Sequence, residues 1–217
     1  MLKLEDRAVH KGQRRALVKT IQQKGIKDPA VLKAMETLPR HFFFDSALHS
    51  HAYEDKAFPI GEGQTISQPF TVAYQTELLE VMPGDKILEI GTGSGYQAAI
   101  LYLLGAEVHS IEYQKKLYEK VRKFLPKLGI DVRFYYGDGT RGLPSAAPFD
   151  KIIVTAGAPV VPKELLKQLA VGGILVIPVG DRTTQKMLKL TKKTNKQIIR
   201  EELDSFAFVP LLGEEGW

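Results

Sequence analysis

The chain has 217 residues, of which 44% are hydrophobic and 25% charged, and its formal net charge is +5 at pH 7. This length and balance predict a sizeable core, and we expect residues 1–217 to form a single domain. No apolar run approaches the ~20 residues that cross a bilayer, and the N-terminus lacks the apolar centre of a signal peptide; we expect no membrane partner and a cytoplasmic location. The absence of cysteine excludes a disulfide framework, a thiolate metal site and a cysteine nucleophile.

The first part of the chain is predicted to be helical. Helices are expected over residues 4–23, 30–38 and 69–81, from the spacing of their apolar residues. Asp28 caps the second helix and Pro39 closes it, while Pro69 opens the third. The chain divides accordingly into a helical preface (1–60), a loop with its helix (61–82) and a core with C-terminal strands (83–217).

From residue 83 onward, short apolar segments alternate with amphipathic ones. Strands are expected over 85–91, 106–113, 131–139, 149–157 and 172–180, and helices over 94–105, 114–129 and 162–170. This alternation indicates a mostly parallel sheet covered on both faces, so the fold class is doubly wound, Rossmann-like α/β. Such sheets bind ligands beyond the carboxyl ends of their strands, which points to the loops after Ile90, Glu112, Tyr136 and Val154.

Much of the positive charge lies near the C-terminus. Residues 182–200 contain seven basic residues and no acid, and they partly alternate with apolar residues around a turn at Thr194 and Asn195. This pattern predicts an antiparallel hairpin at the sheet edge, with lysines facing water and discouraging pairing between edges. A nucleic-acid groove is the alternative, but no aromatic residues alternate with the lysines to stack on bases. We therefore expect no nucleic-acid partner.

The most glycine-rich stretch, ILEIGTGSGYQ, follows the first strand of the alternation. Its small residues are Gly91, Thr92, Gly93, Ser94 and Gly95. A tight turn between strand and helix would explain them structurally, but small residues here also let a ligand approach the backbone. A dinucleotide fingerprint would have the spacing GxGxxG, whereas this turn is GxGxG and is preceded by Glu89, which would repel a pyrophosphate.

Acidic residues follow or end three consecutive predicted strands. Glu112 can accept hydrogen bonds from both ribose hydroxyl groups of a nucleoside. Asp138 can accept a hydrogen bond from an adenine amino group, while Gly139 lets the base lie against the backbone. A single acid at a strand end is usually only solvated, but three around one glycine turn favour a ligand site. The pattern resembles the class I S-adenosylmethionine-dependent methyltransferases. This resemblance implies S-adenosyl-L-methionine as cofactor and S-adenosyl-L-homocysteine as product, with Glu89 and the turn at the amino-acid end.

The run GEGQTISQPFTVA precedes the third predicted helix. Structurally, Ser67 would be the N-cap of that helix, with Pro69 just inside it. The functional alternative is that the loop covers the transferred methyl group. Thr65 or Ser67 would then donate a hydrogen bond to the methyl acceptor.

Four runs together are similar to protein-L-isoaspartate O-methyltransferases: 61–73, 87–99, 154–180 and 208–217. The resemblance covers nearly the whole chain. It implies methyl transfer to the free α-carboxylate of L-isoaspartyl residues in damaged proteins and peptides, which starts repair through a succinimide. It also implies that Ser67 is the catalytic residue. The acceptor-binding residues would be Asp55, Thr65, Ile66, Ala156 and Gly157, in a protein expected to be a monomer.

Other chemistries fit the sequence less well. A metal site at His49 and His51, with Glu54 and Asp55, lacks the consistent ligand geometry of strong sites, and we expect none. Nucleic-acid base methyltransferases commonly carry an Asn/Asp-Pro-Pro-aromatic motif where this chain has TAGAP at 155–159. A module that binds the cofactor or damaged protein without turnover and a hydride-transferring Rossmann enzyme are the remaining alternatives.

Overall fold

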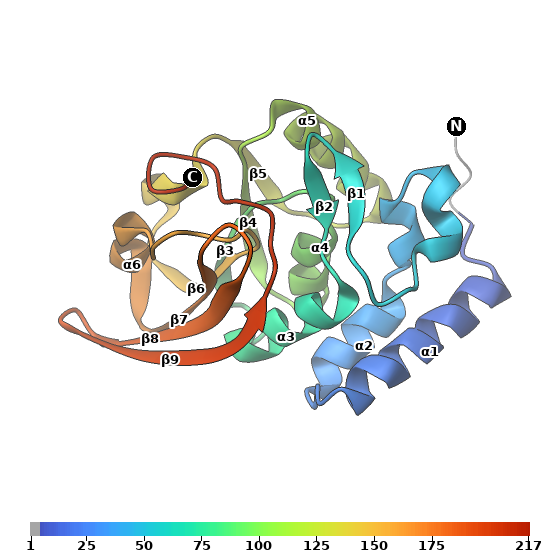
Figure 1. Cartoon of the computed structure of the whole chain (residues 1–217), viewed down its shortest axis with the longest axis horizontal. Coiled ribbons are helices and arrows are strands. Elements are labelled where there is room, and N and C mark those ends of the chain that lie inside the picture. Colours follow the sequence, from blue (N-terminus) through green and yellow to red (C-terminus); the bar gives the residue numbers. More distant parts are fainter. Residues whose placement is uncertain (1–4) are drawn as a thin grey trace.

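The computed structural model describes residues 5–217. A seven-stranded sheet in the order β5-β4-β3-β6-β7-β8-β9 forms its centre, and β1 and β2 form a separate hairpin (Figure 1). The strands are β1 (Phe58–Gly61), β2 (Gln64–Ile66), β3 (Lys86–Ile90), β4 (Glu107–Glu112), β5 (Arg133–Tyr136), β6 (Phe149–Val154), β7 (Leu169–Gly180), β8 (Gln185–Thr194) and β9 (Gln197–Phe206). The first five strands in this order are parallel and the last two pair antiparallel, which confirms the doubly wound, mostly parallel fold.

Helices cover both faces of the large sheet. They are α1 (Ala8–Gln23), α2 (Pro29–Thr37), α3 (Pro69–Leu79), α4 (Tyr96–Leu103), α5 (Lys115–Phe124) and α6 (Lys163–Gln168), with 3-10 turns η1 (Arg40–Phe43), η2 (Ser46–His51), η3 (Leu125–Leu128), η4 (Gly139–Arg141) and η5 (Pro144–Ala146). Helices α3, α4 and α5 cover the face that carries Ile87, while α6 covers the face that carries Leu88. Because successive residues of a strand point to opposite faces, Glu89 shares the face of Ile87.

The ends of the predicted helices follow from single residues. The first helix begins at Ala8 rather than at residue 4, which lies outside the described residues. Helix α3 ends where Glu80 adopts a left-handed φ of 53°. Helix α5 gives way to the turn η3 near Pro126, because proline has no N–H to continue the helical hydrogen bonds. No helix within residues 5–217 has the length and apolar character needed to cross a membrane.

The loop that precedes the third helix contains a hairpin, which the sequence does not predict. Strands β1 and β2 pair antiparallel, and Glu62 and Gly63 between them have φ values of 53° and 69°. Two central residues with positive φ suit the tight turns that join twisted strands. The hairpin lies against the glycine turn, since a Cβ on Gly93 would be 3.4 Å from Cδ1 of Ile60 and 3.9 Å from the carbonyl oxygen of Thr65.

The basic hairpin at the sheet edge is confirmed, but two of its lysines, Lys189 and Lys192, are less exposed than expected. The side chain of Lys189 is 14% exposed and pairs with Glu80. Strands β8 and β9 pair antiparallel, and β9 is the mostly exposed edge. Lys192, however, is only 8% exposed. Its Nζ donates to the carbonyl oxygens of Leu166 (3.0 Å) and Leu169 (2.6 Å), at the end of α6. A cation there satisfies carbonyl groups that a helix leaves without partners at its C-terminus.

Candidate functional site

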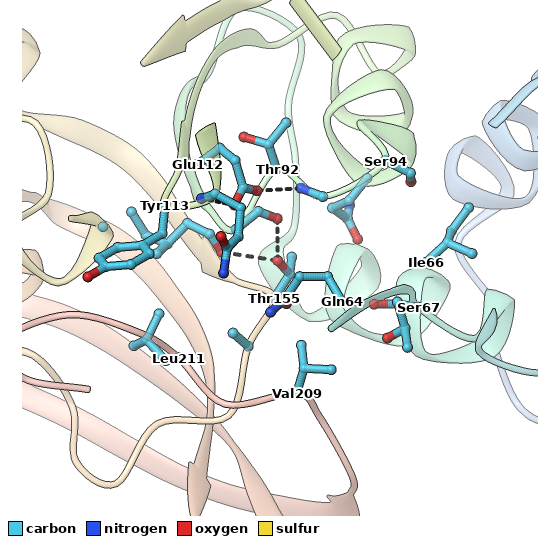
Figure 2. A pocket seen from close by; sticks show the side chains of 18 of the residues that line it. Gln64, Ile66, Ser67, Thr92, Ser94, Glu112, Tyr113, Thr155, Val209 and Leu211 are labelled. Carbon is cyan, nitrogen blue, oxygen red and sulfur yellow. Dashed lines mark hydrogen bonds between the residues drawn. The ribbon is translucent and has the colours of Figure 1, made fainter. Parts of the chain in front are cut away.

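A cavity lies at the carboxyl ends of β3, β4 and β6, the sheet edge that the sequence indicates (Figure 2). Its lining consists of residues 64–67, 72, 90–94, 96–97, 111–114, 139, 155–156 and 209–212. One wall is therefore the glycine turn with the end of β4, and the facing walls are the β2 segment and the C-terminal segment. Among the described residues, 5–217, the lining contains one carboxylate, that of Glu112, and no Lys, Arg or His.

The glycine turn is packed too closely for larger residues. A Cβ on Gly91 would come within 2.6 Å of Oγ1 of Thr155, whose hydroxyl donates to the Gly91 carbonyl oxygen at 2.6 Å. Gly95 has a φ of 83°, and a Cβ on it would come within 2.5 Å of Cγ2 of Val121. Gly91, Thr92, Gly93 and Ser94 line the cavity, whereas Gly95 lets α4 begin close against α5.

Glu112 ends β4 and faces the cavity, as Figure 2 shows. Its Oε2 accepts a hydrogen bond from the backbone N–H of Gly93 (2.8 Å), and its Oε1 accepts one from that of Gln114 (2.7 Å). Burial raises the pKa of Glu112, and these backbone donors act against that rise. A carboxylate held in this way retains lone pairs for a ligand with two neighbouring hydroxyl groups.

Glu89 is fully buried and does not line the cavity. It lies opposite Ser110 in the register of β3 and β4, and the Ser110 hydroxyl donates to its Oε2. Oγ of Ser110 is in turn 2.5 Å from Oγ1 of Thr92, which does line the cavity. Burial raises the pKa of Glu89 to about 8, and its Oε1 has no hydrogen-bond partner within the described chain. Two hydroxyl groups thus connect Glu89 to the cavity by hydrogen bonds, and the neighbouring charge of Glu112 also raises its pKa.

Asp138 follows β5 as expected, but its carboxylate is occupied by protein donors. Oδ1 accepts hydrogen bonds from the backbone N–H (2.9 Å) and hydroxyl (2.7 Å) of Thr140, and Oδ2 accepts one from the backbone N–H of Glu214 (2.9 Å). Burial opposes ionisation of Asp138, but these donors prevail and hold its pKa below the usual value. Gly139 lines the cavity and Asp138 does not, so the expected contact of Asp138 with adenine stays a prediction.

Thr65, Ile66 and Ser67 line the wall formed by β2 and the start of α3 (Figure 2). The N-cap residue of α3 is Gln68, and its side chain makes no capping hydrogen bond to the helix. Instead, the carboxylate of Asp55 accepts a hydrogen bond from the backbone N–H of Phe70 at 2.8 Å. The hydroxyl of Ser67 is therefore not the helix cap that the sequence offers as the structural alternative.

Two of the expected acceptor-binding residues do not line the cavity. Asp55 binds the start of α3, and its Oδ2 also accepts a hydrogen bond from the side-chain amide of Gln68 (3.1 Å). Gly157 exchanges backbone hydrogen bonds of 2.8 Å with Val209 and Leu211. Ala156 does line the cavity. The geometry thus favours structural roles for Asp55 and Gly157.

Part of the lining has no local signal in the sequence. Val209, Pro210, Leu211 and Leu212 form the C-terminal wall, and Pro210 forms a bridge with Gly157. A short apolar run of this kind is compatible with any strand or core segment. These wall residues were predicted to matter only through the resemblance of residues 208–217 to a known family.

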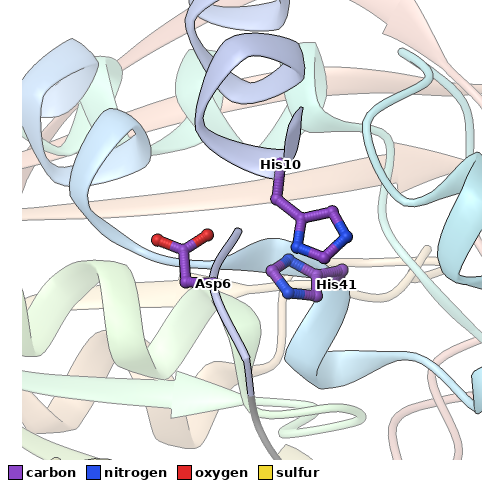
Figure 3. A group of neighbouring side chains, drawn as sticks. All are labelled: Asp6, His10 and His41. Carbon is purple, nitrogen blue, oxygen red and sulfur yellow. The ribbon is translucent and has the colours of Figure 1, made fainter. Parts of the chain in front are cut away.

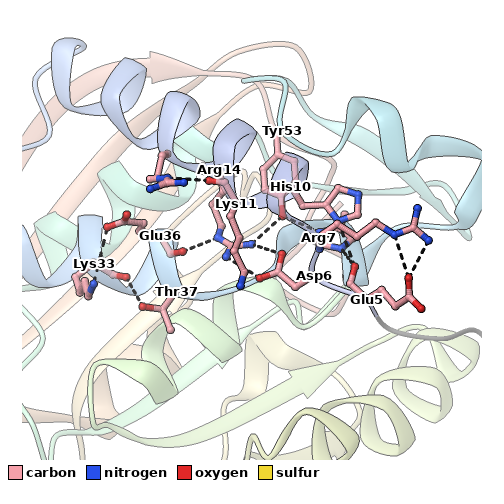
Figure 4. A network of polar contacts seen from close by, with 12 residues as sticks. Glu5, Asp6, Arg7, His10, Lys11, Arg14, Lys33, Glu36, Thr37 and Tyr53 are labelled. Carbon is pink, nitrogen blue, oxygen red and sulfur yellow. Dashed lines mark hydrogen bonds and ion pairs between the residues drawn. The ribbon is translucent and has the colours of Figure 1, made fainter.

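A cluster of possible metal ligands lies elsewhere, at residues that the sequence analysis does not predict to bind a metal. Ligand atoms of Asp6, His10 and His41 lie within 4.8 Å of one another (Figure 3). Protein groups already bind all three residues, as Figure 4 shows in part for the surrounding network. Nδ1 of His10 accepts a hydrogen bond from the backbone N–H of Arg7 at 3.3 Å. Arg14 donates to both oxygens of Asp6 (3.0 and 2.9 Å), and Nδ1 of His41 is 2.7 Å from the Tyr53 hydroxyl oxygen. We assign this cluster to the attachment of the N-terminal segment to α1 and η1.

Known proteins resemble the chain over nearly its full length. The family model described as protein-L-isoaspartate(D-aspartate) O-methyltransferase matches residues 12–216. A protein-L-isoaspartate O-methyltransferase from Cytophaga hutchinsonii is 58% identical over 214 residues, covering 99% of this chain and 97% of its own. One from Christiangramia forsetii is 55% identical over 213 residues, covering 98% and 100%.

Solved structures agree with these sequence relatives. A protein-L-isoaspartate O-methyltransferase matches with a TM-score of 0.83 at 31% identity, over 93% of this chain and 66% of that one. A structure described as a beta-aspartate methyltransferase (PCMT) from Plasmodium falciparum, in complex with S-adenosyl-L-homocysteine, matches with a TM-score of 0.80 at 26% identity. That match covers 92% of this chain and 98% of the other.

Proposed function

The chain belongs to the protein-L-isoaspartate O-methyltransferase family, and from that premise we propose how its own residues transfer a methyl group from S-adenosyl-L-methionine to the α-carboxylate of L-isoaspartyl residues. One observation carries the proposal: the glycine turn with Glu112 and the segment of Thr65 to Ser67 line the same cavity. In the reaction of this family, the methyl ester then closes to a succinimide. Hydrolysis of the succinimide returns part of the damaged chain to normal aspartate.

The residues of the cavity fit this cofactor, which supplies an electrophilic methyl group on a positively charged sulfur when bound. A lining with one carboxylate and no Lys, Arg or His suits a cationic ligand without phosphate. Glu112 accepts hydrogen bonds from the ribose hydroxyl groups. Gly139 has no side chain, so the purine ring can lie against the backbone there. The backbone of the turn at Gly91 and Gly93, which both line the cavity, approaches the amino-acid end of the cofactor.

The acceptor needs no general base in this cavity. An α-carboxyl group with a pKa near ~3.5 is already ionised at pH 7. Ser67 donates a hydrogen bond to one oxygen of that carboxylate, which leaves the other oxygen to attack. Val72, Val209 and Leu211 supply apolar wall that displaces water. Orientation and exclusion of water are then the protein's main contributions to the rate.

Methyl transfer to paired peptides tests the reaction. The two peptides are identical except for aspartate or L-isoaspartate at one position, and the methyl group of S-adenosyl-L-methionine carries a radiolabel. We expect base-labile label on the isoaspartyl peptide alone. Equal labelling of both peptides, or labelling that falls steeply with salt as phosphate recognition does, would contradict the proposal.

The role of Ser67 has its own test. Loss of a hydrogen bond to a charged group costs about 1.5–3 kcal/mol, so Ser67→Ala should lower kcat/KM for the isoaspartyl peptide by roughly 10- to 100-fold. Ser145→Ala is the matched control, because Ser145 is exposed on η5 and does not line the cavity. An unchanged kcat/KM in Ser67→Ala would remove Ser67 from the reaction.

We propose further that residues 1–217 act as one domain and as a monomer. Residues from 64 to 212 contribute to the same cavity lining, which supports a single domain. Sedimentation of the purified protein at micromolar concentration should give the mass of a single chain, and a stable dimer would contradict the proposal. The cytoplasmic location expected from the sequence stays a prediction.

A further inference from the structure

Arg40 is a fully buried cation next to the segment that contains Ser67. Its Nε donates to the carbonyl oxygen of Ala52 (3.0 Å), and its Nη2 donates to the carbonyl oxygen of Ser67 (2.9 Å). The guanidinium lies over the rings of Phe44 and Tyr96, 5.3 and 4.7 Å from their centroids. Tyr96 lines the cavity, so Arg40 stands directly behind the cavity wall.

The surroundings of Arg40 are unfavourable for a residue that serves stability alone. Within residues 5–217, Nη1 of Arg40 has no hydrogen-bond partner, and no carboxylate forms an ion pair with the guanidinium, although the charge of Asp55 attracts it. Burying a charge without a paired counter-charge is strongly unfavourable, and stacking on aromatic rings offsets only part of that penalty. Burial lowers the pKa of Arg40 to about 10, so it is charged at pH 7.

The contacts of Arg40 fix the backbone of the cavity wall at Ser67. Its planar guanidinium holds two carbonyl groups that are far apart in sequence, and the rigid fork sets their relative positions. The backbone N–H of Phe70, three residues after Ser67, donates a hydrogen bond to the carboxylate of Asp55 at 2.8 Å. The main chain is therefore anchored at Ser67 and at Phe70, while the Ser67 hydroxyl is left uninvolved in capping α3.

We infer that Arg40 is a positioning residue for methyl transfer: by holding the Ser67 carbonyl it places the Ser67 hydroxyl against the acceptor carboxylate. The inference rests on the proposed role of Ser67. Arg40 itself does not line the cavity. It acts only through the position of the Ser67 backbone.

Arg40→Lys tests the inference, because lysine keeps the charge but cannot hold both carbonyl groups in the geometry of the fork. A displacement of about 1 Å can cost on the order of 100-fold, so we expect kcat/KM for the isoaspartyl peptide to fall roughly 10- to 100-fold, mainly through kcat. Affinity for S-adenosyl-L-homocysteine, measured by calorimetry, should change little. The matched control is Arg14→Lys, since Arg14 is also buried and donates to a backbone carbonyl, that of Glu36, away from Ser67.

The outcomes separate the inference from the role of Ser67. If Arg40→Lys only lowers the melting temperature, as Arg14→Lys should, Arg40 is structural and the inference is overturned. If it lowers kcat/KM, the same change in a Ser67→Ala background should add little. An equal loss in both backgrounds would show that Arg40 acts by another route, and an unaffected Ser67→Ala enzyme would instead refute the role of Ser67. Should Arg40→Lys not fold, Arg40→Gln, which keeps an N–H donor but not the fork, must give the same non-additive loss with Ser67→Ala.

Discussion

Glu89 is separated from the cavity by the hydroxyl groups of Ser110 and Thr92. Burial raises its pKa to about 8, so a large fraction of this carboxyl group is protonated at pH 7 in the free protein. Because the pKa of Glu89 is higher in the folded chain than in the unfolded chain, its contribution to stability decreases as the pH rises. The contribution of Glu89 to stability is complete below the unfolded pKa of ~4.3 and is lost as the pH rises through about 8.

A cationic ligand should reverse that preference for the protonated form. Because ionised Glu89 attracts a cation, affinity for S-adenosyl-L-methionine, whose sulfur is positively charged, should increase between pH 6.5 and 8.5 in the native chain, and the increase should be smaller in the isosteric variant Glu89→Gln. Calorimetric titration at several pH values measures both curves. Parallel curves would mean that Glu89 does not sense the ligand through Ser110 and Thr92.

At the scale of the element, the start of α3 shows how a cap can come from a distant segment. The carboxylate of Asp55 takes the backbone N–H of Phe70 and is also paired with the Nζ of Lys24 at 2.5 Å. A carboxylate at a helix N-terminus satisfies a free donor and interacts well with the helix dipole. Ser67 is thereby released from the structural role that its position before Pro69 suggests.

Melting temperatures distinguish the two residues. Loss of a helix cap costs about 0.5–2 kcal/mol, which corresponds to a fall of roughly 1–8 °C for a chain of this size, so Asp55→Ala should melt lower than the native chain. Ser67→Ala should melt within about a degree of it, because no cap is lost. An equal fall in both variants would return Ser67 to the role of helix cap.

The N-terminal network around Asp6 and His41 makes a pH-dependent contribution to the stability of the folded chain. The hydrogen bond from Arg14 lowers the pKa of Asp6, and burial lowers the pKa of His41. In both cases the unfolded chain binds a proton more readily than the folded chain, so stability is present above the unfolded pKa and is lost as the pH falls. These values are ~6.5 for His41 and ~3.9 for Asp6.

Stability should therefore decrease in two stages on acidification. His41→Gln should reduce the loss of melting temperature between pH 7.5 and 5.5, while the further loss below pH ~4 that Asp6 contributes should persist. Part of the first stage should also remain in the variant, since burial lowers the pKa of His109 as well. Thermal melts across this pH range measure the effect, and identical profiles for variant and native chain would contradict it.

Long periodic elements were predictable from the sequence, and the direction of individual side chains was not. The strands and helices of the core lie where their apolar spacing places them, but β1 and β2 have only four and three residues, too few for a pattern. The glycine turn and Glu112 line the cavity as predicted. Glu89 is buried because its position in β3 directs its side chain to the helix-covered face of the sheet. The carboxylate of Asp138 accepts a hydrogen bond from the backbone N–H of Glu214, which is 76 residues away and so lies outside any local sequence pattern.

At the scale of the whole molecule, the last residues join loops from distant parts of the chain. The Trp217 indole N–H donates to the carbonyl oxygen of Gly157 (3.0 Å), and Arg182 lies over its ring at 5.2 Å. Gly213 lies against Asp138, where a Cβ would come within 2.0 Å of Oδ1. The C-terminal segment thus contacts the loops after β5, β6 and β7, immediately after the residues that form a wall of the cavity.

Replacement of Trp217 should therefore affect catalysis through the loop at Gly157. Trp217→Phe keeps an aromatic ring but removes the indole N–H, and loss of one neutral hydrogen bond costs about 0.5–1.5 kcal/mol. If that bond fixes the wall at Ala156 and Gly157, kcat/KM for the isoaspartyl peptide should fall by roughly 2- to 10-fold. Glu214→Gln is the control, because the Glu214 pair with Arg141 is largely exposed and such pairs contribute little. Equal kinetics for Trp217→Phe and the native chain would mean that the C-terminal segment covers these loops without positioning them.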